Sequence, residues 1–344
     1  MLVVSLVTLG SPEQLTGGYL YHRRMADAAP VHEARVEFVS ARRAHDPFAA
    51  ARGDVVLVDS IAAPVVAPWA WRPAGGRPLA AILHQPPGGI DHGAVRRAVE
   101  ARLDRSLYRR CALLMAASAA LGDELVGEHR LPAERISVVA PGCDPVTARG
   151  SCDDLRAGRR AAFLSIGNWM ARKGTLELLE AFAGVAPELA TLHLVGRDDV
   201  EPRYATRVRA RLSAPDLAGR VVVHGALPSD AVGRLYAAAD AFVLASYREP
   251  YGTVYGEALA AGLPVVGWRA GNLPHLAEDG LEGVVLEPGD IVGLSHALRR
   301  LALDEPWRLR LSAAARRRGE RLPTWHDTAT AFFGALRRLA AGDG

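Results

Sequence analysis

The chain has 344 residues, of which 49% are hydrophobic and 23% are charged, and its formal net charge is +3. This length suits two domains, and the composition is that of a globular protein with a substantial core. The near balance of charge argues against bulk nucleic-acid binding, and the absence of a long apolar run excludes a transmembrane enzyme.

The three cysteines, Cys111, Cys143 and Cys152, form no Cys-x-x-Cys pair and no metal-ligand spacing. An odd, scattered set is typical of a reducing compartment. The first seven residues contain no basic segment and run directly into strand-like sequence, unlike a secretory signal peptide. These features predict a cytoplasmic protein.

Strands and helices alternate along the first half of the chain. The expected strands are the apolar runs at residues 2–9, 31–39, 54–59, 79–83, 112–117 and 136–139. Helical patterns fall at 94–110 and 118–128, and Gly17-Gly18 opens a helix after the first strand. Continuous apolar strands separated by helices indicate a parallel sheet that is covered on both faces.

The alternation lapses at residues 147–160, where small, polar and charged residues predict a linker. It then resumes, with expected strands at 162–166, 192–195, 221–224, 241–245, 264–267 and 283–286. Helical patterns include 176–183, 231–238 and 254–261, and the tail from 307 to 339 has an entirely helical pattern. The second half therefore repeats the architecture of the first.

The fold class that follows is α/β, with two Rossmann-like, doubly wound domains. We expect residues 1–150 to form the first domain and residues 151–325 to form the second. The final helix, at 326–342, is expected to pack back on the first domain. Ligands in such folds bind beyond the carboxyl ends of the strands and between domains.

The strongest functional signal is the segment 246–266, SYREPYGTVYGEALAAGLPVV, which reads as strand end, loop, helix and Gly-Leu-Pro stop. Backbone N–H groups at the predicted helix start would suit a diphosphate; they belong to Tyr251, Gly252, Thr253 and Val254. Glu249 and Glu257 bracket this site, and paired carboxylates accept hydrogen bonds from sugar diols. The competing interpretation is one helix-stabilising carboxylate and one surface glutamate, but the surrounding pattern favours a binding site.

A second signal is the segment 165–174, SIGNWMARKG, which also lies between a predicted strand and a helix. It contains Lys173, the one lysine among the 41 basic residues; all the others are arginine. Lysine presents a compact point charge that suits a phosphate. A chance survivor is the alternative explanation, and the position of Lys173 favours the phosphate ligand.

Segment 246–266 resembles the glutamate-pair motif of the family-four retaining glycosyltransferases of GT-B fold. The resemblance continues at 270–275, AGNLPH, and at 284–290, VVLEPGD. It implies two Rossmann-like domains that face each other across a cleft, with residues 1–150 as the acceptor domain and residues 151–325 as the nucleotide-sugar donor domain. It further implies that Glu257 binds the nucleotide ribose and that Glu249 binds the transferred sugar. It also implies that the backbone from Tyr251 to Val254 contacts sugar or phosphate.

In this family, the loop that corresponds to 165–174 carries an arginine and a lysine on the donor diphosphate. Lys173 matches the lysine, whereas Asn168 stands at the arginine position. Asparagine donates a hydrogen bond without a charge, so a contact of roughly 1.5–3 kcal/mol is lost or supplied elsewhere. Arg172 and Arg197 are the candidates to supply it.

The first half offers weaker signals. Thr16-Gly17-Gly18 resembles the glycine loop with which the family faces the donor, and adjacent glycines allow close backbone approach to an anion. His84 follows a predicted strand and resembles a cleft histidine of the family, although a lone histidine at a strand end is more often structural. Together the sequence predicts that His84, Glu249 and Lys173 act in catalysis.

The sequence has no Asp-x-Asp element at a predicted strand end, so we expect neither an essential metal ion nor a cofactor; the nucleotide sugar is a substrate. Cationic side chains and a helix N-terminus would neutralise the leaving diphosphate. The resemblance implies a front-face reaction in which the leaving phosphate oxygen accepts the proton of the acceptor hydroxyl.

Six arginines load the predicted helix at 94–110: Arg96, Arg97, Arg102, Arg105, Arg109 and Arg110. Such a run is usually a solvated face. The alternative is contact with anionic lipid or an anionic acceptor, which would place the protein peripherally on the inner face of a membrane.

Three other functions share this architecture. A nucleotide-sugar epimerase would need further ionisable residues in the first domain, and a phosphorylase would need a second anion site. A non-catalytic sugar-nucleotide-binding protein is the third option, which the Asn168 departure favours. A NAD-dependent dehydrogenase is excluded because no Gly-x-Gly-x-x-Gly follows the first strand.

Overall fold

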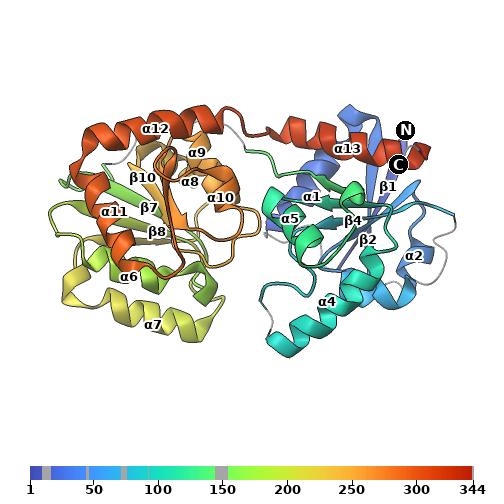
Figure 1. The fold of residues 1–344 in the computed structure, drawn as a ribbon, viewed down its shortest axis with the longest axis horizontal. Helices are drawn as coiled ribbons and strands as arrows, with labels where there is room; N and C mark the ends of the chain where they lie inside the picture. Colours follow the sequence, from blue (N-terminus) through green and yellow to red (C-terminus); the bar gives the residue numbers. More distant parts are fainter. Residues whose placement is uncertain (10–16, 44–45, 71–75, 92, 144–153, 343–344) are drawn as a thin grey trace. The chain divides into compact units, whose positions relative to one another are not determined.

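The structure is a computed structural model that describes residues 1–9, 17–43, 46–70, 76–91, 93–143 and 154–342. The chain divides into two compact units (Figure 1). Unit 1 comprises Met1–Gly142 and Pro323–Gly344, and unit 2 comprises Cys143–Leu322. Each unit is built on a six-stranded sheet whose paired neighbours run parallel. The predicted α/β class is confirmed.

The sheet of unit 1 has the strand order β2-β1-β3-β4-β5-β6. Its strands are β1 (Leu2–Thr8), β2 (Ala34–Ser40), β3 (Val55–Asp59), β4 (Leu79–Leu83), β5 (Leu113–Ala116) and β6 (Ile136–Val138). Its α-helices are α1 (Gly17–Ala28), α2 (Pro47–Ala50), α3 (Ala63–Val66), α4 (Ala94–Tyr108), α5 (Ala119–Gly127) and α13 (Trp325–Ala341). Because β2 lies on one side of β1 and β3 on the other, the strand order reverses between β1 and β3. This is the position at which ligands bind in doubly wound sheets.

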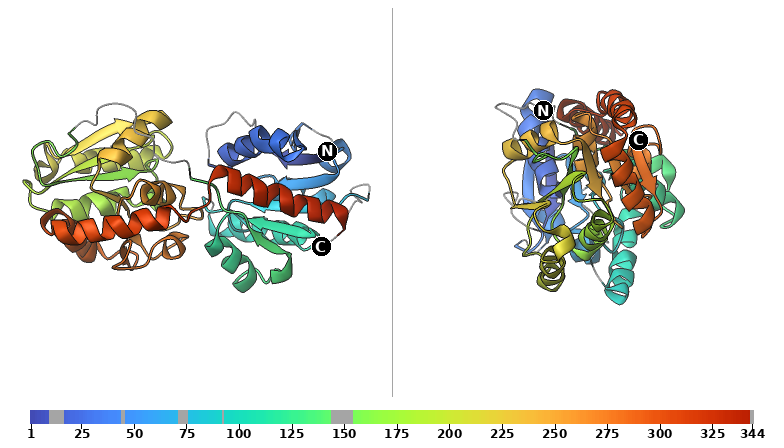
Figure 2. Two further views of the ribbon diagram at one scale, coloured as in Figure 1. Left: turned by 90° about the horizontal axis from the view of Figure 1, so that it is seen from above. Right: turned by 90° about the vertical axis from the view of Figure 1, so that its left-hand side faces the viewer.

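Alternating side chains of these strands feed two cores, one on each face of the sheet. On β3, Val56 and Val58 belong to one cluster, and Val55 and Leu57 to the other. The second cluster also contains residues of α1 and α13. Figure 2 shows α13 lying along unit 1, and the Thr328 hydroxyl donates to the Ala140 carbonyl over 2.9 Å.

The sheet of unit 2 has the strand order β12-β11-β10-β7-β8-β9. Its strands are β7 (Ala161–Ile166), β8 (Ala190–Val195), β9 (Val221–Gly225), β10 (Ala241–Leu244), β11 (Val265–Trp268) and β12 (Gly283–Leu286). Its α-helices are α6 (Thr175–Ala183), α7 (Pro202–Leu212), α8 (Ser229–Ala238), α9 (Thr253–Ala260), α10 (Leu273–Leu276), α11 (Ile291–Leu303) and α12 (Glu305–Gly319). The order reverses between β7 and β10, so these two strands mark its switch point.

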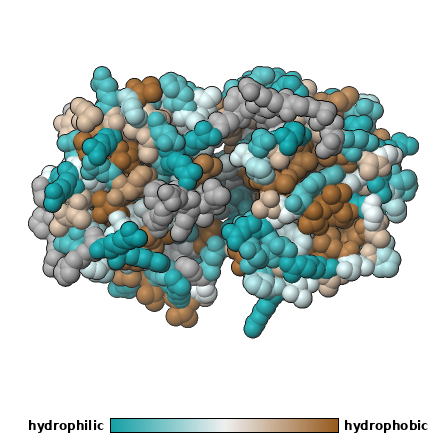
Figure 3. All heavy atoms as spheres, turned by 180° about the vertical axis from the view of Figure 1, so that it is seen from behind, coloured by the Kyte–Doolittle hydropathy of each residue, from teal (hydrophilic) through white to brown (hydrophobic). Residues whose placement is uncertain are grey.

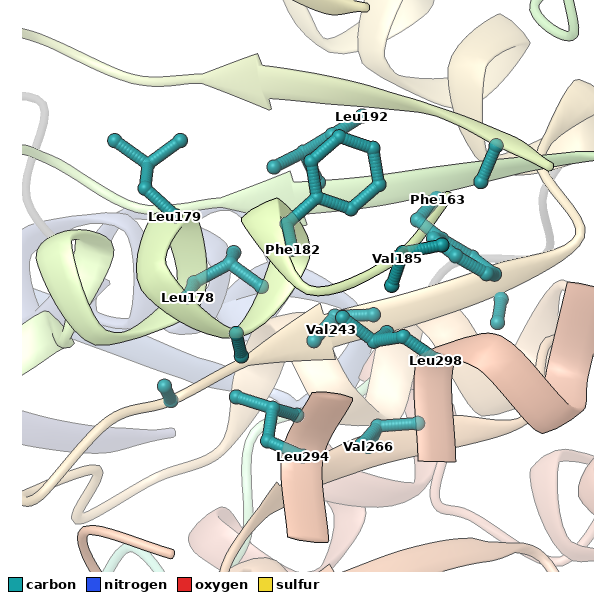
Figure 4. Packing of buried hydrophobic residues seen from close by; sticks show 14 of the residues in the cluster. Phe163, Leu178, Leu179, Phe182, Val185, Leu192, Val243, Val266, Leu294 and Leu298 are labelled. Atoms are coloured by element: carbon teal, nitrogen blue, oxygen red, sulfur yellow. The ribbon is translucent and has the colours of Figure 1, made fainter. Parts of the chain in front are cut away.

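Unit 2 also has a core on each face of its sheet. Phe163 of β7 points to the cluster beneath α6, α7 and α11, whereas its neighbour Leu164 points to the cluster beneath α8 and α9. Figure 4 shows the first of these, where Phe182 of α6 and Leu298 of α11 pack towards the strands. The sheet is therefore covered on both faces, as its continuous apolar strands predict.

Two of the expected elements have different bounds in the structure. The strand predicted at 31–39 begins only at Ala34, because Ala29–His32 forms a 3-10 turn that contains Pro30. The tail is not one helix: α12 ends at Gly319, Pro323 follows, and Thr324 caps α13 through a capping box with Asp327. Of the linker predicted at 147–160, residues 147–153 lie outside the described part.

No helix in the described ranges is both long enough and apolar enough to cross a membrane. On the face drawn in Figure 3, apolar and hydrophilic side chains alternate over both units.

Candidate active site

Two loops of unit 2 meet at the switch point of its sheet, one after β7 and one after β10. The first passes through a short 3-10 turn, Ala171–Lys173, and enters α6 through Gly174, whose φ is 66°. A Cβ at Gly174 would overlap the carbonyl oxygen of Ala245, the residue that follows β10. Glycine therefore allows the close approach that brings Lys173 to the end of β10.

Lys173 forms an ion pair with Glu249 of the second loop, through Nζ and Oε2. The two side chains are only 12% and 11% exposed. The Ser246 hydroxyl lies 3.4 Å from the same carboxylate oxygen. Breaking such a pair leaves a buried charge without compensation, which is costly. The sequence singled out these two residues in separate motifs, 76 positions apart, and the fold joins them in one ion pair.

Backbone contacts fix the two loops against each other. The carbonyl of Arg172 accepts hydrogen bonds from the Tyr247 amide, at 2.8 Å, and from the Ser246 hydroxyl, at 3.1 Å. The guanidinium of Arg172 donates to the Arg248 carbonyl over 3.1 Å. Arg172 therefore takes part in holding the loop that carries Glu249.

Helix α9 begins directly after this loop. Its N-cap is Gly252, with φ 69°, and no side chain in the described part of the chain caps it. The first amides of a helix have no intrahelical acceptor, and the helix dipole favours a negative charge beside them. Asn272 steadies the loop by donating to the Tyr251 carbonyl over 2.9 Å. The start of α9, at Thr253 and Val254, is thus suited to an anion such as a diphosphate.

Glu257 lies about one turn into α9 and is half-buried. The Tyr236 hydroxyl lies 3.0 Å from its Oε2 and 3.1 Å from the Val254 carbonyl oxygen. Tyr236 itself is buried on α8. The carboxylate is therefore held beside the start of the helix, on the same unit as the Lys173–Glu249 pair.

Asn168 follows β7 and is exposed. Its side-chain oxygen accepts a hydrogen bond from the Arg197 amide over 3.0 Å, which joins the loops after β7 and β8. The guanidinium of Arg197 forms two hydrogen bonds of 2.9 Å with the carboxylate of Asp199 on the surface. Of the two arginines expected to replace the missing charge, Arg197 is thus engaged by an acid and Arg172 by a carbonyl.

In unit 1, the predicted glycine pair and His84 lie together. Gly17 and Gly18 begin α1, whereas Thr16 lies outside the described residues. A Cβ at Gly18 would stand 3.3 Å from Cδ2 of His84, so the helix start rests against the imidazole. His84 follows β4 and is only 5% exposed.

Sequence reasoning missed the residues that surround His84. Asp59 ends β3 and is fully buried; its Oδ2 lies 3.1 Å from His22 Nε2 and accepts from the Thr8 hydroxyl over 3.1 Å. The rings of His22 and His84 have centroids 4.8 Å apart. Two signals in the sequence could have found them. Thr8 and Asp59 end β1 and β3, the strands that flank the switch point, and His22 lies one helical turn after Gly18 on α1.

The electrostatics of this cluster keep His84 neutral. The pKa of His84 is lowered to about 3, mainly by burial and to a smaller extent by the neighbouring His22. The carboxylate of Asp59 opposes this shift only in part. Burial alone would raise the pKa of Asp59, but the charge and hydrogen bond of His22, with the Ile61 amide, bring it to about 2. At neutral pH an ionised carboxylate therefore lies close to an uncharged imidazole.

Within the described ranges, two groups bring three metal-ligating side chains within 4.8 Å of one another. One is the buried set of His22, Asp59 and His84, and the other comprises Glu124, Glu128 and His129 near the end of α5. In the first set, Asp59 Oδ2 already contacts His22 and Thr8. Both groups lie in unit 1, away in sequence from the loops of unit 2.

Two family models match the chain. Residues 3–146 match the model described as Glycosyltransferase Family 4, and residues 160–304 match the model described as Glycosyl transferases group 1. Between them the two matches cover most of both units. The second match contains Lys173, Glu249 and Glu257.

Curated relatives are similar over part of their length. Mannosylfructose-phosphate synthase of Agrobacterium fabrum is 28% identical over 233 residues, which cover 64% of this chain and 51% of the relative. A D-inositol 3-phosphate glycosyltransferase of Stackebrandtia nassauensis is 29% identical over 228 residues, covering 61% and 50%. The chain thus spans about half the length of the curated relatives it matches.

Solved structures show the same fold. HepE of Anabaena, in complex with UDP-glucose, superposes with a TM-score of 0.81 at 20% identity and covers 98% of this chain and 100% of its own. Sucrose-phosphate synthase of Thermosynechococcus elongatus gives a TM-score of 0.82 at 18% identity, covering 99% and 100%. These likenesses confirm the GT-B fold that the resemblance implied.

Proposed function

Because the chain belongs to the group 1 glycosyltransferases of family 4, we propose that it transfers a sugar from a nucleotide-sugar donor to an acceptor hydroxyl. The transfer retains the anomeric configuration and needs no metal ion. The observation that carries the proposal is the meeting of the Lys173–Glu249 pair with the start of α9 at the switch point of unit 2.

The roles of the residues follow from their chemistry. Lys173 and the amides of Thr253 and Val254 neutralise the diphosphate, which a metal ion would otherwise do. Glu257 accepts hydrogen bonds from the ribose diol, and Glu249 binds hydroxyls of the transferred sugar. When the diphosphate binds, Lys173 shares its charge between the phosphate and Glu249.

His84 belongs to unit 1 and acts, in this proposal, as a neutral hydrogen-bonding group towards the sugar. An imidazole with a pKa of about 3 stays uncharged at neutral pH, so His84 does not act as a general acid in this reaction. The proton of the acceptor hydroxyl passes to the leaving phosphate oxygen, as the resemblance implies. Closure of the site against water limits hydrolysis of the donor.

A thermal-shift panel of UDP-, GDP-, ADP- and TDP-sugars in EDTA tests donor binding. A ligand at a hundredfold excess over its Kd stabilises the native state by about 2.7 kcal/mol. Because HepE has been solved in complex with UDP-glucose, this donor is the first to include. A shift with one nucleotide class, lost in Lys173→Ala, supports the proposal; no shift with any of the four contradicts it.

Turnover and stereochemistry need separate measurements. With a binding donor and a library of hydroxyl acceptors, NMR of the product's anomeric proton distinguishes retention from inversion. Activity that falls in EDTA and returns with a divalent ion would overturn the metal-free mechanism. Release of an epimerised sugar, or of a sugar phosphate in phosphate buffer, would favour the epimerase or the phosphorylase.

A non-catalytic sugar-nucleotide-binding protein is the second candidate. Asn168 carries no charge, and Arg197 lies against Asp199, so the diphosphate has fewer cationic partners than the family pattern provides. This candidate predicts donor binding without transfer or hydrolysis. Asn168→Arg helps to distinguish the two, because an added charge would tighten donor binding in either case but would raise turnover only in an enzyme.

We also propose that α4 contacts an anionic membrane surface and places the protein at the inner face of the membrane. Val95, Val99 and Leu103 recur at helical spacing on α4 and are 81%, 56% and 37% exposed. Arg96 and Arg102 flank this apolar row and are also exposed. An apolar row between arginines suits the boundary between acyl chains and anionic headgroups.

A further inference from the structure

Glu257 is held in place by a buried tyrosine. The Tyr236 hydroxyl lies 3.0 Å from Glu257 Oε2 and 3.1 Å from the Val254 carbonyl oxygen. A phenol has one proton and both neighbours are acceptors, so the charged carboxylate takes the larger share of the hydrogen bond. One oxygen of Glu257 is thereby fixed on the side of the helix start.

The scaffold around Tyr236 is rigid. The side chain is 2% exposed, and its ring packs against Phe242 of β10 with centroids 5.9 Å apart. Burial raises the pKa of Tyr236 well above its usual value, and the charge of Glu257 adds to this. Its hydroxyl therefore stays protonated at neutral pH and can donate the hydrogen bond to Glu257.

A glutamate has three side-chain torsions, and a half-exposed glutamate on a helix samples several rotamers. A carboxylate recognises a vicinal diol only when both hydroxyls reach acceptors at once. Tyr236 limits this freedom by anchoring one oxygen, and the same hydroxyl also reaches the backbone of Val254 at the first turn of α9. The position of the carboxylate is thus tied to the position of the anion site.

We propose that Tyr236 is a positioning residue that orients Glu257 and so sets the preference of the site for ribonucleotides over deoxyribonucleotides. This inference rests on the proposed function, because it requires a nucleoside diphosphate at the start of α9. It goes further by assigning sugar discrimination in the nucleotide to a residue that does not touch the ligand.

The chain offers a matched control. Tyr255 is another buried tyrosine of unit 2, 1% exposed, and its hydroxyl donates to the Leu244 carbonyl over 2.7 Å. Tyr255→Phe and Tyr236→Phe each remove one buried hydroxyl and its hydrogen bond while keeping the ring. Of these two hydroxyls, that of Tyr236 contacts Glu257 and that of Tyr255 contacts a backbone carbonyl. A general loss of stability would therefore affect both variants, and a loss of discrimination would affect one.

The experiment measures Kd by calorimetry for UDP, GDP and ADP, and then for the 2′-deoxy and 3′-deoxy forms of those that bind. For the unmodified protein we expect deoxy forms to bind about 10- to 100-fold more weakly, the effect of losing a hydrogen bond to a charged group. In Tyr236→Phe the ratio should fall at least about threefold, through weaker ribonucleotide binding. Affinity for the deoxy forms should be unchanged.

A double-mutant cycle with Glu257→Gln checks that Tyr236 acts through Glu257. In the Glu257→Gln background, Tyr236→Phe should leave the ratio unchanged, and Tyr255→Phe should leave it unchanged in both backgrounds. A ratio that survives Tyr236→Phe, or that falls equally in Tyr255→Phe, overturns the positioning role while the proposed function stands. If no nucleoside diphosphate binds the unmodified protein, the proposed function fails and this inference fails with it.

Discussion

The two units carry their polar clusters in the same topological place, but the clusters differ in charge and in exposure. In unit 2, Lys173 and Glu249 form an ion pair at the β7/β10 switch point, and Glu257 nearby is half-buried. In unit 1, Asp59 and His84 lie beside the β1/β3 switch point at 0% and 5% exposure. A charged cluster that includes a half-buried carboxylate beside a helix start suits ligand exchange, whereas a fully buried cluster contributes to the stability of the folded state and changes that stability when it is titrated.

The comparison predicts that substitutions at the unit 2 site act mainly on binding and turnover, whereas substitutions of the buried titratable groups of unit 1 act on stability and its dependence on pH. An effect of Lys173→Ala on stability alone, or of Asp104→Asn on donor binding alone, would contradict the comparison.

The largest expected effect is that of Glu249→Gln. The variant keeps the shape of the side chain but removes the charge that pairs with Lys173 and the acceptor for sugar hydroxyls, so kcat/KM should fall about a thousandfold. Steady-state kinetics with the donor identified by thermal shift measures this. Glu287→Gln is the matched control, because Glu287 pairs with Arg269 on the exposed surface. Equal losses in the two variants would contradict the assignment.

Lys173→Ala comes next. Loss of the compact charge on the diphosphate should weaken donor binding by about 10- to 100-fold, as measured by calorimetry. Arg197→Ala removes a surface charge that Asp199 already engages, so its effect should be smaller. If Arg197→Ala costs more affinity than Lys173→Ala, the arginine has replaced the charge that Asn168 lacks.

Asp104, a buried carboxyl on α4, tests the effect of titration on the stability of unit 1. Burial raises its pKa to about 7 from an ordinary 3.8; the Gly88 amide, which donates to it over 2.8 Å, opposes the shift. Between about pH 4 and 7 the native state keeps a proton that the unfolded chain has released, so the free energy of unfolding falls as pH rises. Each pKa unit is worth about 1.4 kcal/mol, so the fall amounts to a few kcal/mol.

Asp104→Asn keeps the acceptor for Gly88 and cannot ionise. Urea unfolding of this variant should show no such fall, and the variant should be more stable than the unmodified protein at pH 8. An unchanged slope between pH 4 and 7 would show that Asp104 titrates normally.

His84→Asn should affect the acid side of the same profile. Burial lowers the pKa of His84 to about 3, and the neighbouring His22 contributes. Below about pH 6.5 the unfolded chain therefore binds a proton that the native state refuses, and the free energy of unfolding falls as pH falls towards 3. The variant should lose part of this slope and, because His84 also hydrogen-bonds the sugar in the proposed function, it should bind the donor more weakly. An unchanged slope would contradict the assignment of His84 as a buried neutral imidazole.

The smallest effect is expected on α4. Arg96→Gln combined with Arg102→Gln should lower binding to vesicles that contain anionic lipid by about five- to tenfold. A basic residue near such a surface contributes about 1 kcal/mol, and Glu100 already pairs with Arg96 over 2.7 Å. Co-sedimentation at low salt measures this, with neutral vesicles as the control. Equal binding to both vesicle types would contradict an electrostatic contact.

The sequence was sufficient to predict the parallel sheets, because strands covered on both faces are continuous apolar runs. It also predicted the α9 loop, where Glu249, Gly252 and Glu257 lie within nine consecutive residues. The pairing of Lys173 with Glu249 was not predictable from local patterns, because it depends on which strands are neighbours. The cluster around Asp59 was missed for the same reason: Thr8, His22 and His84 come from separate segments and no motif links them.

The return of the chain to unit 1 has a consequence for synthesis on the ribosome. Unit 1 is interrupted by all of Cys143–Leu322 and is completed only by α13, whose Phe332 and Phe333 are buried in its core. Unit 2 is continuous, so it can finish folding while the first 142 residues still expose the apolar surface that α13 will cover. Unit 2, which leaves the ribosome after most of unit 1, is therefore the first to have its complete core. Truncation within α13 would leave the core of unit 1 incomplete and prone to aggregation.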